Sequence, residues 1–194
     1  MKNNDADISL KERIRTTLAG RRKKVITRQG LRPAAVLIPI YEADGEYHIL
    51  LTRRTDKVEY HQGQVSFPGG AREEEDDSLL ATALRESCEE IGLCTDNIEI
   101  LGEIDDTATV TSNFAVSPFV AAIPYPYDFV INEDEVVEVV SVPIRALLEP
   151  GNSTEEQGML DGALHTIYIY RYGDLNIWGA TAKMLKQLLD LVFG

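Results

Sequence analysis

Two apolar segments near the start of the chain have the pattern of a β-hairpin. Residues 34–40 form a short, β-branched and nearly continuous apolar run, which is typical of a strand that is covered on both faces. Asp44-Gly45 is a tight-turn signal, and the largely apolar segment 47–52 follows it as a pairing strand. The hydrophobic pattern therefore predicts an antiparallel pair of strands joined at this turn.

The rest of the chain mixes strand-like and helix-like segments. Further strands are predicted over 97–103, 115–123, 136–142 and 164–171. Apolar residues at helical spacing predict helices over 8–19, 77–91 and 179–192. Residues 149–163 are rich in glycine and turn-forming residues, which predicts a loop. Strands on both sides of a central helix, without strict alternation of strands and helices, predict one α/β (α+β) domain.

Composition indicates an ordinary globular chain with an acidic surface. It has 194 residues, of which 44% are hydrophobic, so one domain with its own core is expected and disorder is not. The 32 acidic and 19 basic residues give a net charge of −13. This charge disfavours nucleic acids and anionic lipids as partners, because both present phosphates. An anionic substrate needs a metal cation to supply the missing positive charge.

The cysteines and the first residues indicate a cytoplasmic setting. Cys88 and Cys94 are too few for a disulfide scaffold, and we expect both to be free thiols. The first seven residues lack the apolar core of a signal peptide. Because no run of about 18 apolar residues occurs, no membrane span is expected either.

A basic stretch separates the first predicted helix from the first predicted strand. Its basic residues are Arg21, Arg22, Lys23, Lys24, Arg28 and Arg32. One interpretation is a solvated linker, and the other is that part of the stretch faces an anionic ligand. Residues 1–32 are therefore assigned to an N-terminal extension, made of a helix and a basic linker, and residues 33–194 to the main domain.

The predicted helix over 77–91 carries the most informative side chains. One face is an apolar stripe, and the other carries Arg85, Glu86, Glu89 and Glu90. Spacings of three and four residues place these carboxylates one turn apart, where like charges repel and where the helix dipole disfavours anions. Magnesium takes oxygen ligands and bridges to phosphates, so we interpret the cluster as a metal site. The alternative is an ordinary solvated face.

The segments that flank this helix favour the metal hypothesis. The Phe-Pro-Gly-Gly segment over 67–70 allows a backbone carbonyl to approach a ligand closely. The polar residues 76–78 supply capping acceptors for the start of the helix. Arg85 is expected to pair with Asp77 or with Glu89.

Residues 85–93 read Arg-Glu-Ser-Cys-Glu-Glu-Ile-Gly-Leu. Together with Gly70 ahead of them, they resemble the Nudix box, whose usual form is G-x5-E-x7-R-E-U-x-E-E-x-G-U with U aliphatic. Ser87 stands at one of the aliphatic positions. The likeness covers roughly residues 33–190 and implies the Nudix fold, a mixed β-sheet sandwiched between α-helices.

The first half of the box departs from the usual form. The segment from Gly70 to Arg85 is one residue longer, and Asp76 or Asp77 replaces the first Glu. A box of this kind is similar to that of the coenzyme A pyrophosphatase branch of the family. That branch also carries an upstream signature of the form L-L-T-x-R-S-x-x-L-R-x-x-x-G-x-V-x-F-P-G-G.

Residues 50–70 fit most of this signature, from Leu-Leu-Thr-Arg-Arg at the start to Gly-x-Val-x-Phe-Pro-Gly-Gly at the end. Arg54 occupies the first basic position, whereas Glu59 reverses the charge of the second. This reversal leaves the identity of the substrate open without changing the hydrolytic motif. Further segments that look like that branch are 111–120, 132–139 and 177–182.

The resemblance implies a role for individual residues. The expected metal ligands are Glu86, Glu89, Glu90 and the carbonyl of Gly70. The expected catalytic residues are Glu86, Glu89 and Arg85, of which Arg85 orients the glutamates. Candidate substrate-site residues are Arg54, His61 and Glu135. Glu135, with Glu138 as second choice, is also the candidate for a later carboxylate that completes the site.

The implied activity is hydrolysis of the pyrophosphate bond of a nucleoside diphosphate derivative with Mg²⁺ or Mn²⁺. In this branch the substrate is coenzyme A or acyl-coenzyme A, and the products are 4′-phosphopantetheine and adenosine 3′,5′-bisphosphate. Two alternatives stay open: a Nudix pyrophosphatase for ADP-ribose, a dinucleotide polyphosphate or a nucleoside triphosphate, and a non-catalytic Nudix-fold sensor. The expected partner is a small molecule, and a homodimer would be unsurprising.

Overall fold

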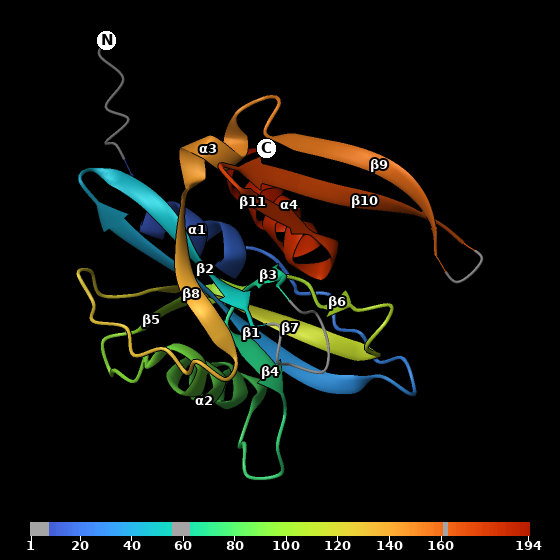
Figure 1. The fold of residues 1–194 in the computed structure, drawn as a ribbon, viewed down its shortest axis with the longest axis horizontal. Helices are drawn as coiled ribbons and strands as arrows, with labels where there is room; N and C mark the ends of the chain where they lie inside the picture. The colour runs from blue at the N-terminus through green and yellow to red at the C-terminus, as the bar shows by residue number, and fades with distance from the viewer. Residues whose placement is uncertain (1–7, 56–62, 161–162) are drawn as a thin grey trace.

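The computed structural model describes residues 8–55, 63–160 and 163–194 (Figure 1). The helices are α1 (Leu10–Ala19), α2 (Leu79–Ile91), α3 (Ile144–Leu148) and α4 (Gly179–Phe193). The strands are β1 (Arg32–Ala43), β2 (Glu46–Arg54), β3 (Val65–Ser66), β4 (Gly69–Ala71), β5 (Glu99–Glu103), β6 (Thr107–Ala108), β7 (Phe114–Ala122), β8 (Val136–Pro143), β9 (Ser153–Leu160), β10 (Ala163–Tyr172) and β11 (Leu175–Trp178). Within these ranges, no helix combines the length and the apolar character that crossing a membrane requires.

Strands β1 to β8 form a mixed sheet built around β1. The path of the main sheet is β3-β2-β1-β7-β5, while β4 pairs with β1, β6 with β7 and β8 with β2. Strand β1 is antiparallel to β2 and β4 but parallel to β7. The predicted hairpin is confirmed, since Ala43 pairs with Glu46 across the turn at Asp44-Gly45.

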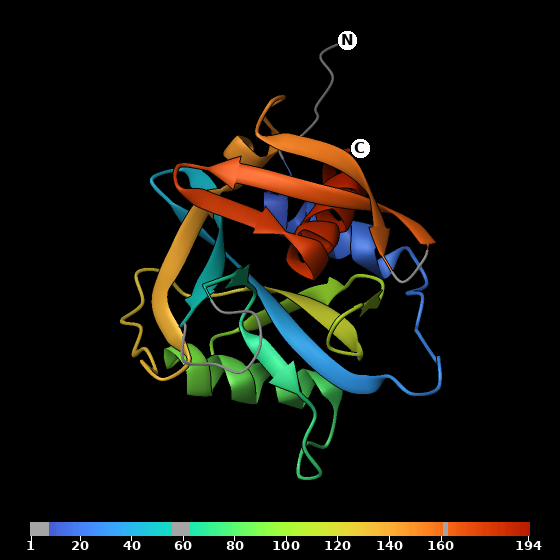
Figure 2. The same cartoon turned by 45° about the vertical axis from the view of Figure 1, so that its right-hand side comes forward.

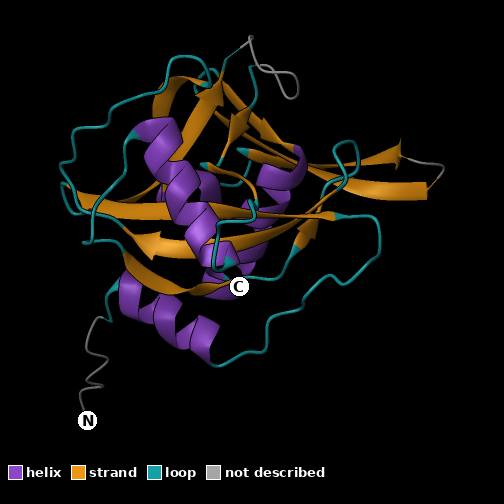
Figure 3. Ribbon diagram, turned by 90° about the horizontal axis from the view of Figure 1, so that it is seen from below, coloured by secondary structure: helices purple, strands orange, loops and turns teal. Residues whose placement is uncertain are grey.

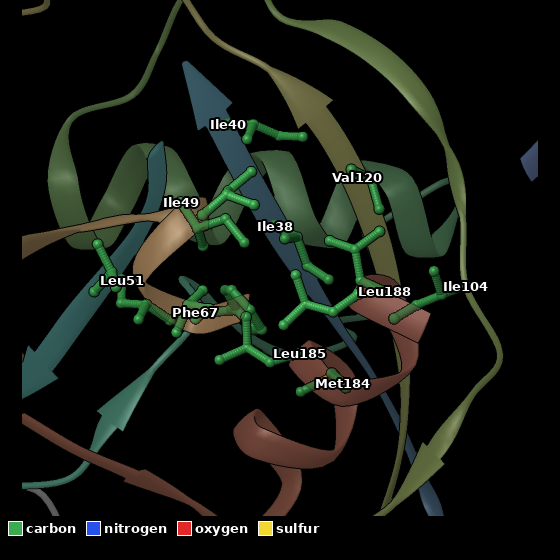
Figure 4. Close-up of a cluster of buried hydrophobic side chains, with 14 of the residues drawn as sticks. Ile38, Ile40, Ile49, Leu51, Phe67, Ile104, Val120, Met184, Leu185 and Leu188 are labelled. Carbon is green, nitrogen blue, oxygen red and sulfur yellow. The ribbon is translucent and has the colours of Figure 1, made fainter. Parts of the chain in front are cut away.

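Strand β1 is apolar throughout because it faces two cores. Ile38 and Ile40 belong to the core that α4 covers, where Ile38 lies near Leu185 and Leu188 and Ile40 near Ile49 (Figure 4). Leu37 and Tyr41 alternate with them and belong to the second core, on the side of α2. The continuous apolar run thus reflects burial on both faces of the sheet.

Helices lie on both sides of the main sheet (Figure 3). Ile14 and Leu18 of α1 join α4 in the first core, and Ala83 and Ile91 of α2 lie in the second. The predicted sandwich of a mixed sheet between helices is therefore confirmed. Ile8, in contrast, lies before the helix, because the hydroxyl of Ser9 accepts the Glu12 N–H as the N-cap, and Ile8 is exposed.

The loop prediction for residues 149–163 was wrong for Ser153–Leu160, which form strand β9. Strand β9 pairs antiparallel with β10, with Gln157 opposite Thr166, and β11 completes a separate three-stranded sheet. The two longer strands form an arm that projects from the body of the molecule (Figures 1 and 2). Because β9 is an edge strand with exposed polar residues, it lacks the apolar pattern by which strands are detected.

The basic stretch after α1 is partly docked on the sheet. Arg21 forms an ion pair with Asp105, and Lys23 pairs with Glu103 (2.6 Å) and Asp106 (3.0 Å). The backbone N–H of Ile26 also donates to the Asp106 carboxylate (2.9 Å). Residues 21–26 are therefore held against the end of β5 rather than forming a solvated linker.

Candidate active site

Helix α2 presents its glutamates to the glycine strand β4. The helix begins where the Ser78 hydroxyl accepts the N–H of Ala81 (3.1 Å), and it ends at Gly92, whose φ of 68° turns the chain away. Glu90 is buried on the same side of α2 as Ala83 and Ile91, so the predicted division into an apolar face and a separate glutamate face is wrong for Glu90. On this buried side Glu90 meets Gly69, and the neighbouring Glu86 meets Gly70. The packing of the apolar stripe therefore aims the carboxylates.

Glu86 lies directly against Gly70. A Cβ atom added to Gly70 would lie 2.5 Å from the Glu86 carboxylate, so only glycine allows this approach. Burial raises the pKa of Glu86, the Arg85 guanidinium opposes the rise, and the charges of Glu89 and Glu135 add to it. The predicted neighbours Glu86 and Gly70 are thus brought together.

Glu90 is almost completely buried, with 1% of its side chain exposed. Its carboxylate accepts the backbone N–H of Gly69 (3.2 Å) and pairs with Nη1 of Arg54 (3.0 Å). Burial raises the pKa of Glu90 to about 7, and the charges of Glu86 and Glu135 act in the same direction. Arg54 and the Gly69 N–H oppose this rise.

Glu135 comes from the loop before β8 and joins the same place. Its carboxylate lies close enough for its charge to raise the pKa of both Glu86 and Glu90. Its backbone carbonyl accepts the N–H of Thr55, next to Arg54, at 3.0 Å. We call Glu86, Glu90 and Glu135 the carboxylate cluster.

Arg85 has a different environment from the cluster. Its guanidinium donates to both carboxylate oxygens of Asp76 (3.0 and 3.1 Å) and to the Ala71 carbonyl (3.1 Å). It also pairs with Glu89 (2.9 Å) and with Glu86 (3.0 Å). The hydrogen bonds from Arg85 lower the pKa of Asp76, and the Glu73 backbone N–H and the Thr82 hydroxyl contribute to this.

We call Arg85, Asp76 and Glu89 the Arg85 clamp. The predicted pairing of Arg85 with Glu89 is confirmed. The alternative partner Asp77 was wrong, because it is exposed one residue beyond the buried Asp76. Asp76 is therefore the acidic residue of the lengthened box that reaches the arginine.

The other predicted site residues lie apart from the cluster or are not described. The Glu89 side chain is 53% exposed and its carboxylate is turned toward Arg85. Glu138 pairs with Arg53 (2.7 Å), which also pairs with Asp174. His61 and Glu59 lie outside the described residues.

The donor set of the cluster suits a hard divalent cation. Within the described residues, no three or more His, Cys, Asp or Glu side chains are arranged so that they could hold a metal ion together. The Glu90 carboxylate is instead bonded to Arg54 and the Gly69 N–H. Carboxylate oxygens are nevertheless the ligands that Mg²⁺ prefers, and a cation between them would relieve the repulsion that helps to raise the pKa values of Glu86 and Glu90.

Cys88 and Cys94 are joined by a disulfide, so the expectation of two free thiols was wrong. The left-handed turn at Gly92 brings the chain back over the last turn of α2, which places the two Cα atoms 4.7 Å apart. The sequence separation of six residues gave no sign of this return.

Comparison with known proteins identifies the family. Residues 30–161 match the model of the NUDIX domain. The chain belongs to the Nudix family. The Nudix hydrolase NudL of Yersinia pestis is 35% identical over 161 residues, which cover 83% of this chain and 80% of NudL. The chain is therefore a pyrophosphohydrolase of this family, whose members generally use divalent metal ions.

Solved structures of the family share the fold. A MutT/nudix family protein from Enterococcus faecalis superposes with a TM-score of 0.57 at 16% identity, over 88% of this chain and 71% of that one. The Nudix hydrolase RenU of M. smegmatis gives a TM-score of 0.51 at 20% identity, over 62% and 76% of the two chains. At these identities the likeness concerns the fold alone.

Two groups at the site were not predicted from the sequence. One is the Gly69 N–H, which donates to Glu90. The other is Asn132, whose amide nitrogen donates to the Glu135 carboxylate (3.2 Å). The sequence analysis had only noted that residues 132–139 look like a segment of the coenzyme A pyrophosphatase branch. This likeness was the one sign in the sequence that Asn132 could belong to the site.

Proposed function

We propose that this Nudix hydrolase cleaves the pyrophosphate bond of coenzyme A or acyl-coenzyme A, with Mg²⁺ or Mn²⁺ as its metal. The products are 4′-phosphopantetheine and adenosine 3′,5′-bisphosphate. The observation that carries the hydrolytic part is the carboxylate cluster beside Gly70. The choice of substrate is supported by residues 50–70, which fit most of the coenzyme A signature and place Arg54 at the cluster.

The residues that would hold the metal are Glu86, Glu90 and Glu135, together with the carbonyl of Gly70. When bound, divalent ions neutralise the diphosphate, polarise a phosphoryl oxygen and acidify water. Glu89 is a weaker candidate, since its carboxylate is committed to Arg85 and exposed. The net charge of −13 makes such cations necessary for an anionic substrate to approach.

The protein groups have separate tasks in this proposal. Glu86, with its raised pKa and its place against Gly70, accepts a proton from water better than an exposed carboxylate would. Arg85 contacts Glu86 while it is fixed by Asp76, so it orients the carboxylate. Arg54 lies beside Glu90 and is assigned to bind a phosphate oxygen of the substrate.

A panel of diphosphate compounds tests the proposal. Purified protein is incubated with coenzyme A, acetyl-coenzyme A, ADP-ribose, a dinucleotide polyphosphate and a nucleoside triphosphate, each with Mg²⁺, Mn²⁺ or EDTA. We expect metal-dependent release of adenosine 3′,5′-bisphosphate from the coenzyme A compounds at the highest kcat/KM. Turnover of ADP-ribose alone would overturn the choice of substrate.

The principal alternative is a Nudix pyrophosphatase for ADP-ribose or another dinucleotide. The feature that favours it is Glu59, which reverses the second basic position of the coenzyme A signature. Ligand binding without any product release would instead indicate a sensor.

A further inference from the structure

The loop between β7 and β8 is bonded to the end of the catalytic helix. The N–H of Val130 donates to the Ile91 carbonyl (3.1 Å), and the N–H of Asn132 donates to the Glu90 carbonyl (2.9 Å). The Tyr127 hydroxyl donates to the Gly92 carbonyl (2.8 Å). The carbonyls of Glu90 and Ile91, which the helix leaves unpaired, are thus satisfied by this loop.

Asn132 uses all its polar groups in this connection. Besides its N–H, its carbonyl oxygen accepts the N–H groups of Glu135 (3.0 Å) and Val136 (2.9 Å). Its side-chain Oδ1 accepts the N–H of Asp134 (3.2 Å), which closes a tight local turn. Its Nδ2 donates to Oε1 of Glu135 (3.2 Å).

One residue therefore joins the backbone of Glu90 to the carboxylate of Glu135. On the far side, the Glu135 carbonyl is fixed by the Thr55 N–H. An amide suits the position because it donates to Glu135 without neutralising it. An ammonium group at the same place would compete with a cation for the carboxylate.

We propose that Asn132 is a positioning residue that sets the Glu135 carboxylate against Glu86 and Glu90. The inference rests on the proposed function, in which Glu135 helps to hold the metal. Partners of this kind, which orient a metal ligand, typically change metal affinity or activity by about 10–100-fold when they are removed.

The test is a pair of variants that keep the turn and remove the donor. In Asn132→Asp the Oδ1 acceptor stays, and a charged oxygen faces Glu135. In Asn132→Ser a short hydroxyl keeps the acceptor for the Asp134 N–H but does not reach Glu135. For both we expect kcat to fall about 10–100-fold and KM to change less than threefold.

A second readout does not depend on turnover. Mn²⁺ binding to the substrate-free protein, followed by electron paramagnetic resonance, is expected to weaken about tenfold or more in Asn132→Ser, which removes the donor without adding a charge. The exposed neighbour Glu133 supplies the control, and Glu133→Gln is expected to bind Mn²⁺ like the wild type. Thermal unfolding in EDTA reports whether each variant is folded.

A double variant separates positioning from a general effect. If Asn132 acts through Glu135, Asn132→Ser combined with Glu135→Gln binds Mn²⁺ no more weakly than Glu135→Gln alone. Additive losses, or wild-type Mn²⁺ affinity in Asn132→Ser, would overturn the proposal. A wild-type protein that hydrolyses no diphosphate would overturn the proposed function instead, and the Mn²⁺ cycle still decides the role of Asn132.

Discussion

The Arg85 clamp and the carboxylate cluster share one helix but treat charge in opposite ways. In the clamp, Asp76 is buried against a guanidinium, and its pKa is lowered. In the cluster, Glu86 and Glu90 are buried beside another carboxylate, and their pKa values are raised. All three carboxylates contact an arginine, so the difference lies in the balance of effects: hydrogen bonds outweigh burial at Asp76, whereas burial and neighbouring carboxylates outweigh the arginines at Glu86 and Glu90.

The largest expected effect comes from neutralising one member of the cluster. Glu86→Gln should lower kcat about 10³-fold, or about 4 kcal/mol, because it removes a carboxylate that holds the metal or accepts a proton. Glu89→Gln is the matched change in the clamp, where the carboxylate is exposed and paired with Arg85. Its loss should be at least tenfold smaller.

Steady-state kinetics with Mg²⁺ on the preferred substrate measures both variants. Equal losses in Glu86→Gln and Glu89→Gln would show that the clamp glutamate turns into the site when metal binds. Glu89 would then belong to the carboxylate cluster rather than to the Arg85 clamp.

A change in the Arg85 clamp should lower the stability of the fold more than it lowers metal affinity. Asp76→Asn leaves Arg85 without its buried carboxylate and should destabilise the fold by about 2 kcal/mol, since hydrogen bonds to charged groups contribute about 1.5–3 kcal/mol. For a chain of this length that corresponds to a Tm lower by roughly 4–8 °C. Asp77→Asn, one residue away and exposed, is the control and should leave Tm within about a degree.

The two regions should also respond to pH in opposite directions. In the metal-free protein, Glu90 keeps its proton up to about pH 7, whereas its ordinary pKa is 4.5. Between these values the folded state binds a proton that the unfolded state has lost, so the Glu90 contribution to stability decreases as the pH rises. Asp76, with a lowered pKa, stabilises the fold above its ordinary pKa of 3.8, and this stability is lost as the pH falls further.

Urea unfolding in EDTA between pH 4.5 and 8 measures the Glu90 contribution. In the wild type, the Glu90 contribution to the free energy of unfolding should fall by about 2–3 kcal/mol as the pH rises across this range, since one pKa unit corresponds to about 1.4 kcal/mol. Glu90→Gln cannot titrate here, so its free energy of unfolding should lack this fall. Parallel pH profiles of the two proteins would contradict the raised pKa of Glu90.

The local parts of the structure were predictable from the sequence. The hairpin at Asp44-Gly45 follows from turn chemistry, and the facing of Glu86 and Glu90 follows from a spacing of four residues on a helix. The closeness of Gly70 to the glutamates was expected from the resemblance to the Nudix box, which implies that the Gly70 carbonyl and the glutamates are metal ligands. The hairpin and the facing of Glu86 and Glu90 depend on neighbours within a few residues, whereas Gly70 and Glu86 are 16 positions apart and are connected only through the family motif.

Features that depend on distant contacts were not predictable. The choice of Asp76 over Asp77 requires knowledge of which residue is buried beside Arg85. Strand β9 is defined by pairing with β10 rather than by its own apolar pattern. The bond from Asn132 to the Glu90 carbonyl joins residues 42 positions apart, and no local rule connects them.

The attachment of the β7–β8 loop to the end of α2 has a consequence for protein engineering. Since Asn132 and Val130 are bonded to backbone carbonyls of the helix, the position of Glu135 is tied to the end of α2. A transplant of the glutamate helix alone into another scaffold would therefore leave out part of the proposed metal site. The transplanted unit would also need residues 127–136 and the glycine strand β4.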